Sequence, residues 1–259
     1  MSDLFDVSGK TALVTGGSRG IGLMIAHGLV QRGARVIVSS RKEGPVQEAA
    51  NQLSALGDCV GIPGDVSTPE GAAALAQATT EHFGGELDIL VNNAGTTWGA
   101  PLAEFPATGW DRVAHTNVEG AFHLTVGLLE ALRRAASRED PARVVNIGSI
   151  DGIRTPSVEN YSYSASKAAV HMLTRHLAKR LAEESITVNA IAPGPFQSKM
   201  MAFLLDDPES RAAVEGTVPL RRIGHPDDIA GLILFLCSRA GSYMTGTVIP
   251  LDGGITGCS

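Results

Sequence analysis

The sequence has few cysteines and no concentrated positive charge. Cys59, Cys237 and Cys258 are the only cysteines among 259 residues, and their odd number and wide spacing favour reduced thiols over a disulfide framework or a zinc site. The formal net charge is −6 and no long basic block occurs. We therefore expect neither a nucleic acid nor an anionic membrane surface as a partner. These features favour an enzyme that acts on a small molecule and carries no metal.

Long apolar runs are also missing. No segment reaches the ~18 consecutive apolar residues that a membrane-spanning helix needs. Met1–Val7 has no positively charged region ahead of an apolar stretch, so we predict a cytoplasmic protein. No repeat or low-complexity tract divides the chain, and a hydrophobic content of 44% is sufficient for one large core. Residues 1–259 are predicted to form a single domain.

Short β-branched runs alternate with longer amphipathic stretches along the chain. This alternation is typical of successive βαβ units around a parallel sheet that is buried on both faces. The predicted strands are Thr11–Thr15, Arg35–Ser39, Cys59–Pro63, Ile89–Val91, Arg143–Gly148, Thr187–Ala192 and Thr247–Pro250. The predicted helices are Ile21–Arg32, Pro45–Leu56, Pro69–Phe83, Gly109–Ala136, Tyr161–Glu184 and Pro226–Ser238. The predicted fold class is α/β, a single-domain Rossmann-type doubly wound parallel sheet of about seven strands with helices on both faces.

A glycine-rich loop directly follows the first predicted strand. Its glycines are spaced Gly-x-x-x-Gly-x-Gly at the start of a predicted helix. Glycine permits a tight turn, close approach of the backbone to a pyrophosphate, and close packing of the helix on the strand. Unpaired N–H groups at the helix start would bind the anion, although such a loop can also be an ordinary turn. The predicted cofactor contacts in this loop are Gly16, Ser18, Arg19, Gly20, Ile21 and Gly22.

The end of the second predicted strand indicates which dinucleotide binds. An NAD site usually presents a carboxylate there, whereas this chain reads Ser-Ser-Arg-Lys at residues 39–42. The guanidinium group of Arg41 presents a fork of donors that suits a 2′-phosphate, with Ser40 and Arg19 as further contacts. NADP(H) is therefore the predicted cofactor. The alternative, that Arg41 is an ordinary solvated side chain, stays open because Glu43 is close in the sequence.

Tyr163 and Lys167 stand four positions apart in a predicted helix, so their side chains share one helix face. The pKa of a free phenol is about 10, and a neighbouring cation lowers it. The pair therefore has the chemistry of a proton donor. Taken alone, Tyr and Lys at this spacing also occur on ordinary solvated faces. Tyr161 lacks such a partner, because Ala165 follows it four residues later.

Several motifs, in the same order, resemble those of the short-chain dehydrogenase/reductases of the classical branch, and the resemblance covers nearly the whole chain. Thr15–Gly22, Asp65–Val66, Asn92–Gly95 and Pro193–Gly194 resemble the family's cofactor loop, adenine contact, fourth-strand motif and nicotinamide-side turn. The further cofactor contacts that this resemblance implies are Asp65, Val66, Asn93, Ala94, Gly95, Tyr163, Lys167, Pro193 and Gly194. The catalytic group that it implies is Asn117, Ser149, Tyr163 and Lys167.

The resemblance also gives each member of the catalytic group a role. Tyr163 would give a proton to the carbonyl oxygen as hydride reaches the carbonyl carbon, and Ser149 would orient that carbonyl by a hydrogen bond. Lys167 would lower the pKa of the phenol and hold the nicotinamide ribose hydroxyls. Asn117 would hold a water that links Lys167 to solvent. Run backwards, the same group would oxidise an alcohol.

Residues 195–220 are similar to the segment that covers the substrate in this family, so we expect a substrate lid there. Methionine and leucine side chains adapt to apolar ligands such as an acyl chain. The apolar residues of this segment are Met200, Met201, Phe203, Leu204 and Leu205. The alternative is that they simply pack on the body of the protein.

Within the family, Asn92–Gly99 and Pro141–Ser149 are most similar to reductases of 3-oxoacyl thioesters, so a 3-oxoacyl thioester is the expected substrate. Glu184 and Asp140 stand where reductases that dock acyl carrier protein carry arginine, and these carboxylates would repel an acidic carrier. The arginines that could compensate, or that are ordinary surface charges, are Arg133, Arg134, Arg138 and Arg175. A coenzyme A thioester, a free keto compound and a sugar-like ketone stay open.

Two other functions are compatible with the sequence. One is an alcohol or polyol dehydrogenase working in the oxidative direction, and the other is a nucleotide-sensing protein that lost turnover. Ser149, Tyr163 and Lys167 favour an enzyme, because a sensor has no need of a phenolic acid. The apolar faces of Gly109–Ala136 and Tyr161–Glu184 exceed what one sheet can cover, so we also expect a homotetramer or homodimer.

Overall fold

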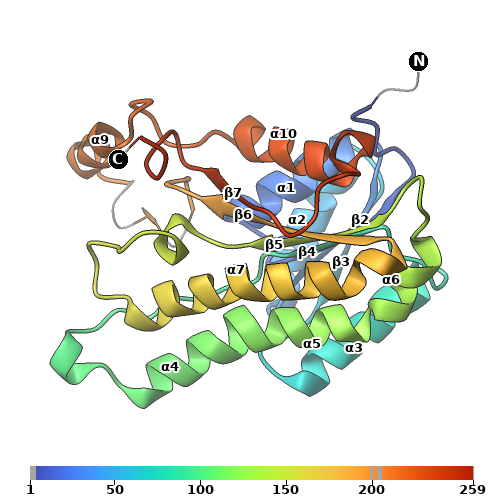
Figure 1. The fold of residues 1–259 in the computed structure, drawn as a ribbon, viewed down its shortest axis with the longest axis horizontal. Coiled ribbons are helices and arrows are strands. Elements are labelled where there is room, and N and C mark those ends of the chain that lie inside the picture. The colour runs from blue at the N-terminus through green and yellow to red at the C-terminus, as the bar shows by residue number, and fades with distance from the viewer. Residues whose placement is uncertain (1–3, 199–200, 203–205, 259) are drawn as a thin grey trace.

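The fold is a seven-stranded parallel sheet with helices on both faces (Figure 1). The computed structural model describes residues 4–198, 201–202 and 206–258. The strand order is β3-β2-β1-β4-β5-β6-β7, so the chain moves from β1 in the middle of the sheet to one edge at β3 and returns to the middle at β4. Doubly wound sheets bind ligands where the strand order reverses in this way. The predicted fold class and the single domain are confirmed.

The strands lie within one or two residues of their predicted positions. They are β1 (Thr11–Thr15), β2 (Arg35–Ser40), β3 (Cys59–Pro63), β4 (Ile89–Asn92), β5 (Ala142–Ile147), β6 (Ile186–Pro193) and β7 (Val248–Leu251). Leu13 of β1 stands opposite Ile37 of β2 and Leu90 of β4. Leu13 and the next residue, Val14, belong to different core clusters on the two faces of the sheet. The inner strands are apolar throughout because helices cover both faces.

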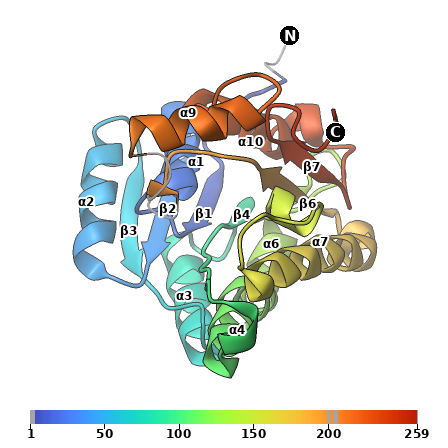
Figure 2. The same cartoon turned by 90° about the vertical axis from the view of Figure 1, so that its left-hand side faces the viewer.

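Two helical layers enclose the sheet (Figure 2). The helices of one layer are α1 (Gly20–Gln31), α2 (Glu43–Ser54) and α10 (Pro226–Cys237), and those of the other are α3 (Pro69–His82), α5 (Gly120–Gly127), α6 (Leu129–Ala135) and α7 (Tyr161–Leu181). Short 3₁₀ turns occur at Leu102–Glu104, Ile150–Gly152, Ala182–Glu184 and Arg239–Gly241. None of the helices in the described ranges has the length and apolar character that crossing a bilayer requires.

The prediction of one continuous helix over Gly109–Ala136 is wrong. The segment consists of α4 (Ala107–Ala114), a π-turn at His115–Glu119, α5, and α6 after a break at Leu128. Contacts with other segments accompany the π-turn: the side chain of Asn117 bonds Thr96 and Ser166, and a Cβ on Gly120 would lie 2.4 Å from the carbonyl oxygen of Val66. Local hydrophobic periodicity does not encode such contacts, so the sequence pattern could not reveal the break.

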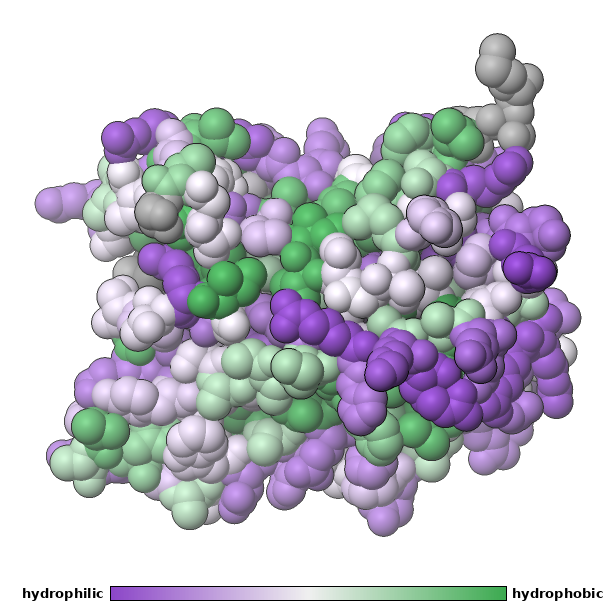
Figure 3. Space-filling model, viewed as in Figure 1, coloured by the Kyte–Doolittle hydropathy of each residue, from purple (hydrophilic) through white to green (hydrophobic). Residues whose placement is uncertain are grey.

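The segment expected to form a lid follows β6 and contains α9 (Pro208–Thr217). Buried Phe196 forms an isolated parallel bridge with Gly224 at the base of the segment. A recess of about 100 Å³ opens there between Phe196, Leu220 and Leu251, and Figure 3 shows apolar side chains gathered between α9 and α10. Met200, Phe203, Leu204 and Leu205 lie outside the described residues.

Candidate active site

The glycine-rich loop after β1 leaves room for a phosphate group. Gly16 and Gly20 have φ angles of +64° and +54°, a left-handed conformation that glycine adopts without strain. A Cβ on Gly22 would lie 2.4 Å from Asn93 Nδ2, so no larger residue fits where α1 meets the end of β4. Arg19 precedes α1 without capping it by its side chain, and the first turn contains no acidic residue. The N–H groups of that turn are therefore available to an anion.

Thr15 connects the glycine-rich loop to the end of β4. Its hydroxyl oxygen accepts hydrogen bonds from the backbone N–H groups of Asn93 and Ala94, both at 3.0 Å, and donates to Val91 O at 3.2 Å. Asn93 Nδ2 donates back to Thr15 O at 2.8 Å and Gly16 O at 3.2 Å. The two predicted cofactor motifs are therefore held as one unit. Sequence reasoning did not assign Thr15 this function, although its place directly before Gly16 was a usable signal.

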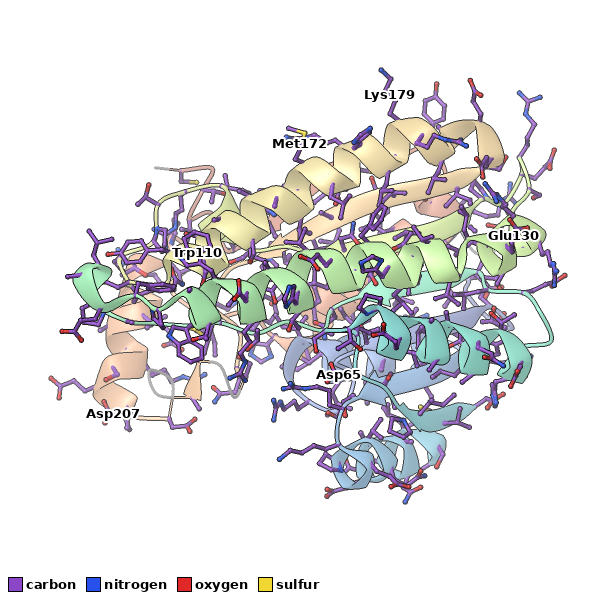
Figure 4. The ribbon with its side chains drawn as sticks, turned by 90° about the horizontal axis from the view of Figure 1, so that it is seen from below. Asp65, Trp110, Glu130, Met172, Lys179 and Asp207 are labelled. Carbon is purple, nitrogen blue, oxygen red and sulfur yellow. The ribbon has the colours of Figure 1, made fainter. Side chains whose placement is uncertain are left out.

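The predicted adenine end of the site lies where β2 and β3 end. Arg41 is exposed there, and Ser40 and Ser18 are half-buried. Asp65 accepts hydrogen bonds from the Ser67 N–H at 3.0 Å and the Ser67 hydroxyl at 2.7 Å. Burial raises the pKa of Asp65, but these hydrogen bonds and the positive charge of Arg41 outweigh burial and hold the pKa below its usual range. Arg41 and Asp65, which is labelled in Figure 4, therefore lie at the same end of the predicted cofactor site.

Ser149, Tyr163 and Lys167 converge beyond the carboxyl end of β5. The hydroxyl of Ser149 shares a hydrogen bond with the phenol of Tyr163 and accepts another from the Asp151 N–H at 3.1 Å. Lys167 Nζ lies 5.5 Å from the centroid of the Tyr163 ring and donates to Ile147 O at 2.8 Å. Three members of the predicted catalytic group are thus neighbours, just after the end of β5 and on the first turns of α7.

Burial controls the ionisation of this group. It raises the pKa of Tyr163 to about 12; the hydrogen bond to Ser149 acts in the opposite direction, and the negative charge of Asp151 adds to the rise. Burial also lowers the pKa of Lys167 to about 8. The net effect is a rise, because removal of the phenol from water outweighs its neighbours. The lowering of the Tyr163 pKa by Lys167 stays a prediction.

Asn117, the fourth predicted member, is buried in the π-turn. Its Oδ1 accepts from the Thr96 N–H at 2.8 Å, and its Nδ2 donates to Thr96 O at 3.0 Å and Ser166 Oγ at 2.9 Å. A Cβ on Gly95 would lie 3.5 Å from Asn117 Oδ1 and 3.7 Å from Lys167 Nζ, so Asn117 belongs to the same site. Both amide protons of Asn117 are used within the protein. The water-holding role of Asn117 stays a prediction.

The predicted nicotinamide-side turn is held tightly against β7. Pro193, the last residue of β6, stands opposite Leu251, and the Gly194 N–H donates to Leu251 O at 3.0 Å. A Cβ on Gly194 would lie 2.8 Å from Asp252 Cα. Only glycine therefore allows the two chain segments to approach this closely.

Sequence reasoning missed the polar neighbours of the catalytic group. Asp151 accepts a hydrogen bond from Asn160 Nδ2 at 3.4 Å, and burial raises the pKa of its carboxyl group. Ser166 donates to Tyr163 O at 2.7 Å and accepts from Asn117. Ser166 stands directly before Lys167 in the sequence, but no motif marked Asp151.

The carboxylates expected to repel an acidic carrier are ion-paired. Glu184 bonds Arg133 and Arg180, each at 2.6 Å, and Asp140 bonds Lys10 at 2.6 Å and buried Arg143 at 3.0 Å. Their negative charge is therefore compensated locally. Arg133 is one of the arginines expected to compensate. It also contacts Glu130, so its positive charge is balanced by neighbouring carboxylates. The other arginines that were expected to compensate, all exposed, are Arg134, Arg138 and Arg175.

Comparison with known proteins places this site in a family. Residues 16–256 match the sequence model of a family described as enoyl-(acyl carrier protein) reductase. The rhamnolipids biosynthesis 3-oxoacyl-[acyl-carrier-protein] reductase of Pseudomonas aeruginosa is 50% identical over 98% of this chain and 99% of its own length. Gluconate 5-dehydrogenase of Gluconobacter oxydans is 36% identical over 98% of this chain and 97% of its own length.

A solved structure has nearly the same backbone. The complex of Pseudomonas aeruginosa RhlG with NADP superimposes with a TM-score of 0.96 at 50% identity, and the match covers 99% of this chain and all of the other. Similarity at this level over the full length indicates common descent as well as a common fold. The chain belongs to the short-chain dehydrogenase/reductase family.

Proposed function

We propose that this protein reduces a ketone with NADPH, using Tyr163 as the general acid. The observation that carries the proposal is the convergence of Ser149, Tyr163 and Lys167 beside Gly95, at the same edge of the sheet as the glycine-rich loop. The relative named as a 3-oxoacyl reductase and the relative solved with NADP support the reaction class and the cofactor.

The residues of the site suit this reaction. Bound NADPH supplies the hydride. The hydroxyl groups of Ser149 and Tyr163 are fixed donors that would stabilise the negative charge developing on the carbonyl oxygen. Because the pKa of Tyr163 is raised to about 12, the phenol keeps its proton at neutral pH and can deliver it to the more basic alkoxide. Lys167 would hold the ribose hydroxyls, since its ammonium group is buried beside the site.

The cofactor preference rests on the end of β2. Arg41 is exposed next to Asp65, where a guanidinium group can grip a 2′-phosphate, and Ser40 lies beside it. Because residues 39–42 contain no carboxylate that could accept from a ribose 2′-hydroxyl, NADPH is favoured over NADH. The glycine-rich loop would take the pyrophosphate and Pro193–Gly194 the nicotinamide side.

A 3-oxoacyl thioester is the proposed substrate. The 50% identical relative is named for this reaction. The recess beside Phe196, Leu220 and Leu251 offers apolar side chains to an acyl chain, although Arg222, Asp228 and Asp252 line it as well. Purified protein should consume NADPH with 3-oxoacyl thioesters of coenzyme A or acyl carrier protein more efficiently than with simple ketones or keto sugar acids. Activity with none of these thioesters would contradict the substrate assignment.

The role of Tyr163 has its own test. Tyr163→Phe removes the transferable proton but keeps the ring, so turnover should fall below detection while NADPH still binds, as measured by nucleotide fluorescence. Tyr161→Phe is the matched control, because the Tyr161 hydroxyl bonds Glu159 at the surface. Ketone reduction retained by Tyr163→Phe would contradict the assigned role.

The second candidate is a polyol dehydrogenase working in the oxidative direction. The 36% identical gluconate 5-dehydrogenase supports it, and so does the carboxyl group of Asp151 near Tyr163, since a carboxylate can accept from a substrate hydroxyl. Oxidation of gluconate or another polyol with NADP⁺ that is faster than thioester reduction would favour this candidate.

We also propose that residues 195–220 close over the substrate and that the chain forms a homotetramer or homodimer in the cytoplasm. The outer faces of α4, α5 and α7 carry exposed apolar side chains; Trp110 and Met172 are labelled in Figure 4. Apolar patches of this kind mark protein interfaces. The described cysteines are all free thiols, which suits a reducing compartment.

A further inference from the structure

His171 is a buried titratable residue of α7 to which the proposed reaction gives no role. It follows Lys167 by one helical turn on the same face of α7, and only 5% of its surface is exposed. The groups that influence its ionisation are Lys167 on the same face and Arg175 one turn further along the helix. Its ring points from α7 toward the segment that carries Ser149.

The imidazole ring fills the space left by two glycines on either side of the Ser149 segment. A Cβ on Gly148 would lie 2.2 Å from His171 Nε2, and a Cβ on Gly152 would lie 2.8 Å from His171 Cε1. Gly148 precedes Ser149 directly, and Gly152 ends the 3₁₀ turn Ile150–Gly152 that follows it. The ring therefore touches the Ser149 segment at both of its ends.

A hydrogen bond adds direction to this contact. The imidazole faces the backbone of Gly152 closely enough for that backbone to raise its pKa, and because Nε2 has no partner among the described residues, we assign the donor of this bond as Nδ1. The same turn holds Ser149: the Gly152 N–H donates to Ser149 O at 3.0 Å, and the Asp151 N–H donates to Ser149 Oγ at 3.1 Å. An apolar side chain could fill the same space but could not orient the turn.

The Nε2 atom of His171 has no hydrogen-bond partner among the described residues, which bears on why a histidine occupies this position. A buried nitrogen without a hydrogen bond is unfavourable, and burial, together with the charge of Lys167, lowers the pKa of His171 to about 4, so the ring is neutral. A leucine here would avoid the unsatisfied nitrogen. The gain that offsets it is the single bond from Nδ1 to the turn carrying Ser149.

We propose that His171 is a positioning residue, which fixes the Ser149 turn on α7 and so aligns the Ser149 hydroxyl with Tyr163. The inference rests on the proposed function, in which both hydroxyls act on the carbonyl oxygen. His171 does not touch the reacting atoms. It links the strand that supplies Ser149 to the helix that supplies Tyr163 and Lys167.

The test compares His171→Asn, His171→Gln and His171→Leu. Asparagine places an amide donor near the position of Nδ1, glutamine places it near Nε2, and leucine has no donor. We expect kcat for ketone reduction to fall about tenfold to a hundredfold in the Leu and Gln variants and to be largely retained in the Asn variant. NADPH affinity should stay within about twofold in all three, because the contacts described for His171 involve neither the glycine-rich loop nor Arg41. His176→Leu, at an exposed position of the same helix, is the control.

A double-mutant cycle with Ser149→Ala separates positioning from general support of the fold. If His171 acts through Ser149, His171→Leu should cost little further kcat in the Ser149→Ala enzyme. Losses that multiply fully, or equal kcat in the Asn and Gln variants, would overturn the proposal. Should the leucine variant not fold, the Asn and Gln pair and its cycle with Ser149→Ala carry the test. Wild-type protein that reduces no ketone would refute the proposed function instead, before any variant is compared.

Discussion

At the scale of single residues, the site depends on how strongly each ionisable group is removed from water. The pKa of Tyr163 is raised to about 12, chiefly by burial. A phenol that holds its proton this firmly is poorly suited to be a base at neutral pH but well suited to donate to an alkoxide. The protonated phenol therefore suits the proposed reduction of a ketone. The identity of the catalytic residues could be predicted from motifs, but not this pKa, because burial is decided by segments distant in the sequence.

Asp151→Asn should lower the pKa of Tyr163, because it removes a negative charge that disfavours the phenolate. Reduction needs the protonated phenol, so kcat/KM should fall with rising pH through that pKa, and in the variant the fall should begin at a lower pH. The measurement is the pH profile of kcat/KM on the alkaline side. Glu48→Gln, exposed on α2, is the control and should leave the profile unchanged. A profile that does not move in Asp151→Asn would show that this charge does not reach the phenol.

Arg41→Ala should weaken NADPH binding far more than NADH binding, since only NADPH carries the 2′-phosphate. A charge-assisted hydrogen bond is worth about 1.5–3 kcal/mol, which corresponds to a loss of roughly tenfold to a hundredfold in NADPH affinity. Calorimetric titration with both nucleotides measures it. Lys42→Ala is the control at the neighbouring exposed position. Equal losses for the two nucleotides would remove the basis of the cofactor assignment.

At the scale of elements, α7 carries its catalytic and other buried polar side chains along one face. Tyr163, Lys167, His171 and Thr174 follow each other at helical spacing, and the last of them bonds Asn146 on β5 at 2.9 Å. Asn146 in turn accepts from Asn92 on β4 at 2.9 Å. This buried polar chain fixes α7 to the strands that end at the site. Most element positions could be predicted from apolar periodicity, whereas polar contacts that cross between elements, such as these, could not.

His171 on α7 should make the folded protein less stable in mild acid. The pKa of His171 is lowered from 6.5 to about 4, so the unfolded chain binds a proton in this range that the folded chain excludes. The stabilisation is present above about pH 6.5 and is lost as pH falls toward 4, by a total on the order of 3 kcal/mol. Urea unfolding midpoints at several pH values measure it. In His171→Leu the acid-dependent loss should be smaller by that amount, and an unchanged pH dependence would contradict the prediction.

At the scale of the whole molecule, the outer surface of one helical layer is unusually apolar. The exposed fractions are 45% for Trp110, 40% for Phe122, 51% for Val126 and 61% for Met172. These residues lie on α4, α5 and α7; the inner faces of α5 and α7 already cover the sheet, and α4 packs against α7. The sequence predicted an uncovered apolar face from helix length, and the structure locates it on these three helices.

Wild-type protein should therefore elute as a dimer or tetramer, and the double variant Phe122→Asp, Met172→Glu should shift toward monomer without losing helix content. In an interface formed by this face, the introduced charges would be buried without partners, which would destabilise the oligomer. Multi-angle light scattering and circular dichroism give the two readouts. Leu56→Asp, an exposed apolar position at the end of α2, is the control. Wild-type protein that is monomeric at micromolar concentration would rule out an oligomer.

The π-turn at His115–Glu119 sets the angular phase of the helices on either side of it. Each residue of a regular helix turns the chain by about 100°. Deleting Val118 would therefore make α4 and α5 one regular helix but rotate Asn117 away from Gly95. With the extra residue in place, α4 packs against α7 while α5 packs against α3. The same helical segment can therefore pack its first half on α7 and its second half on α3, which a regular helix of the same length could not do.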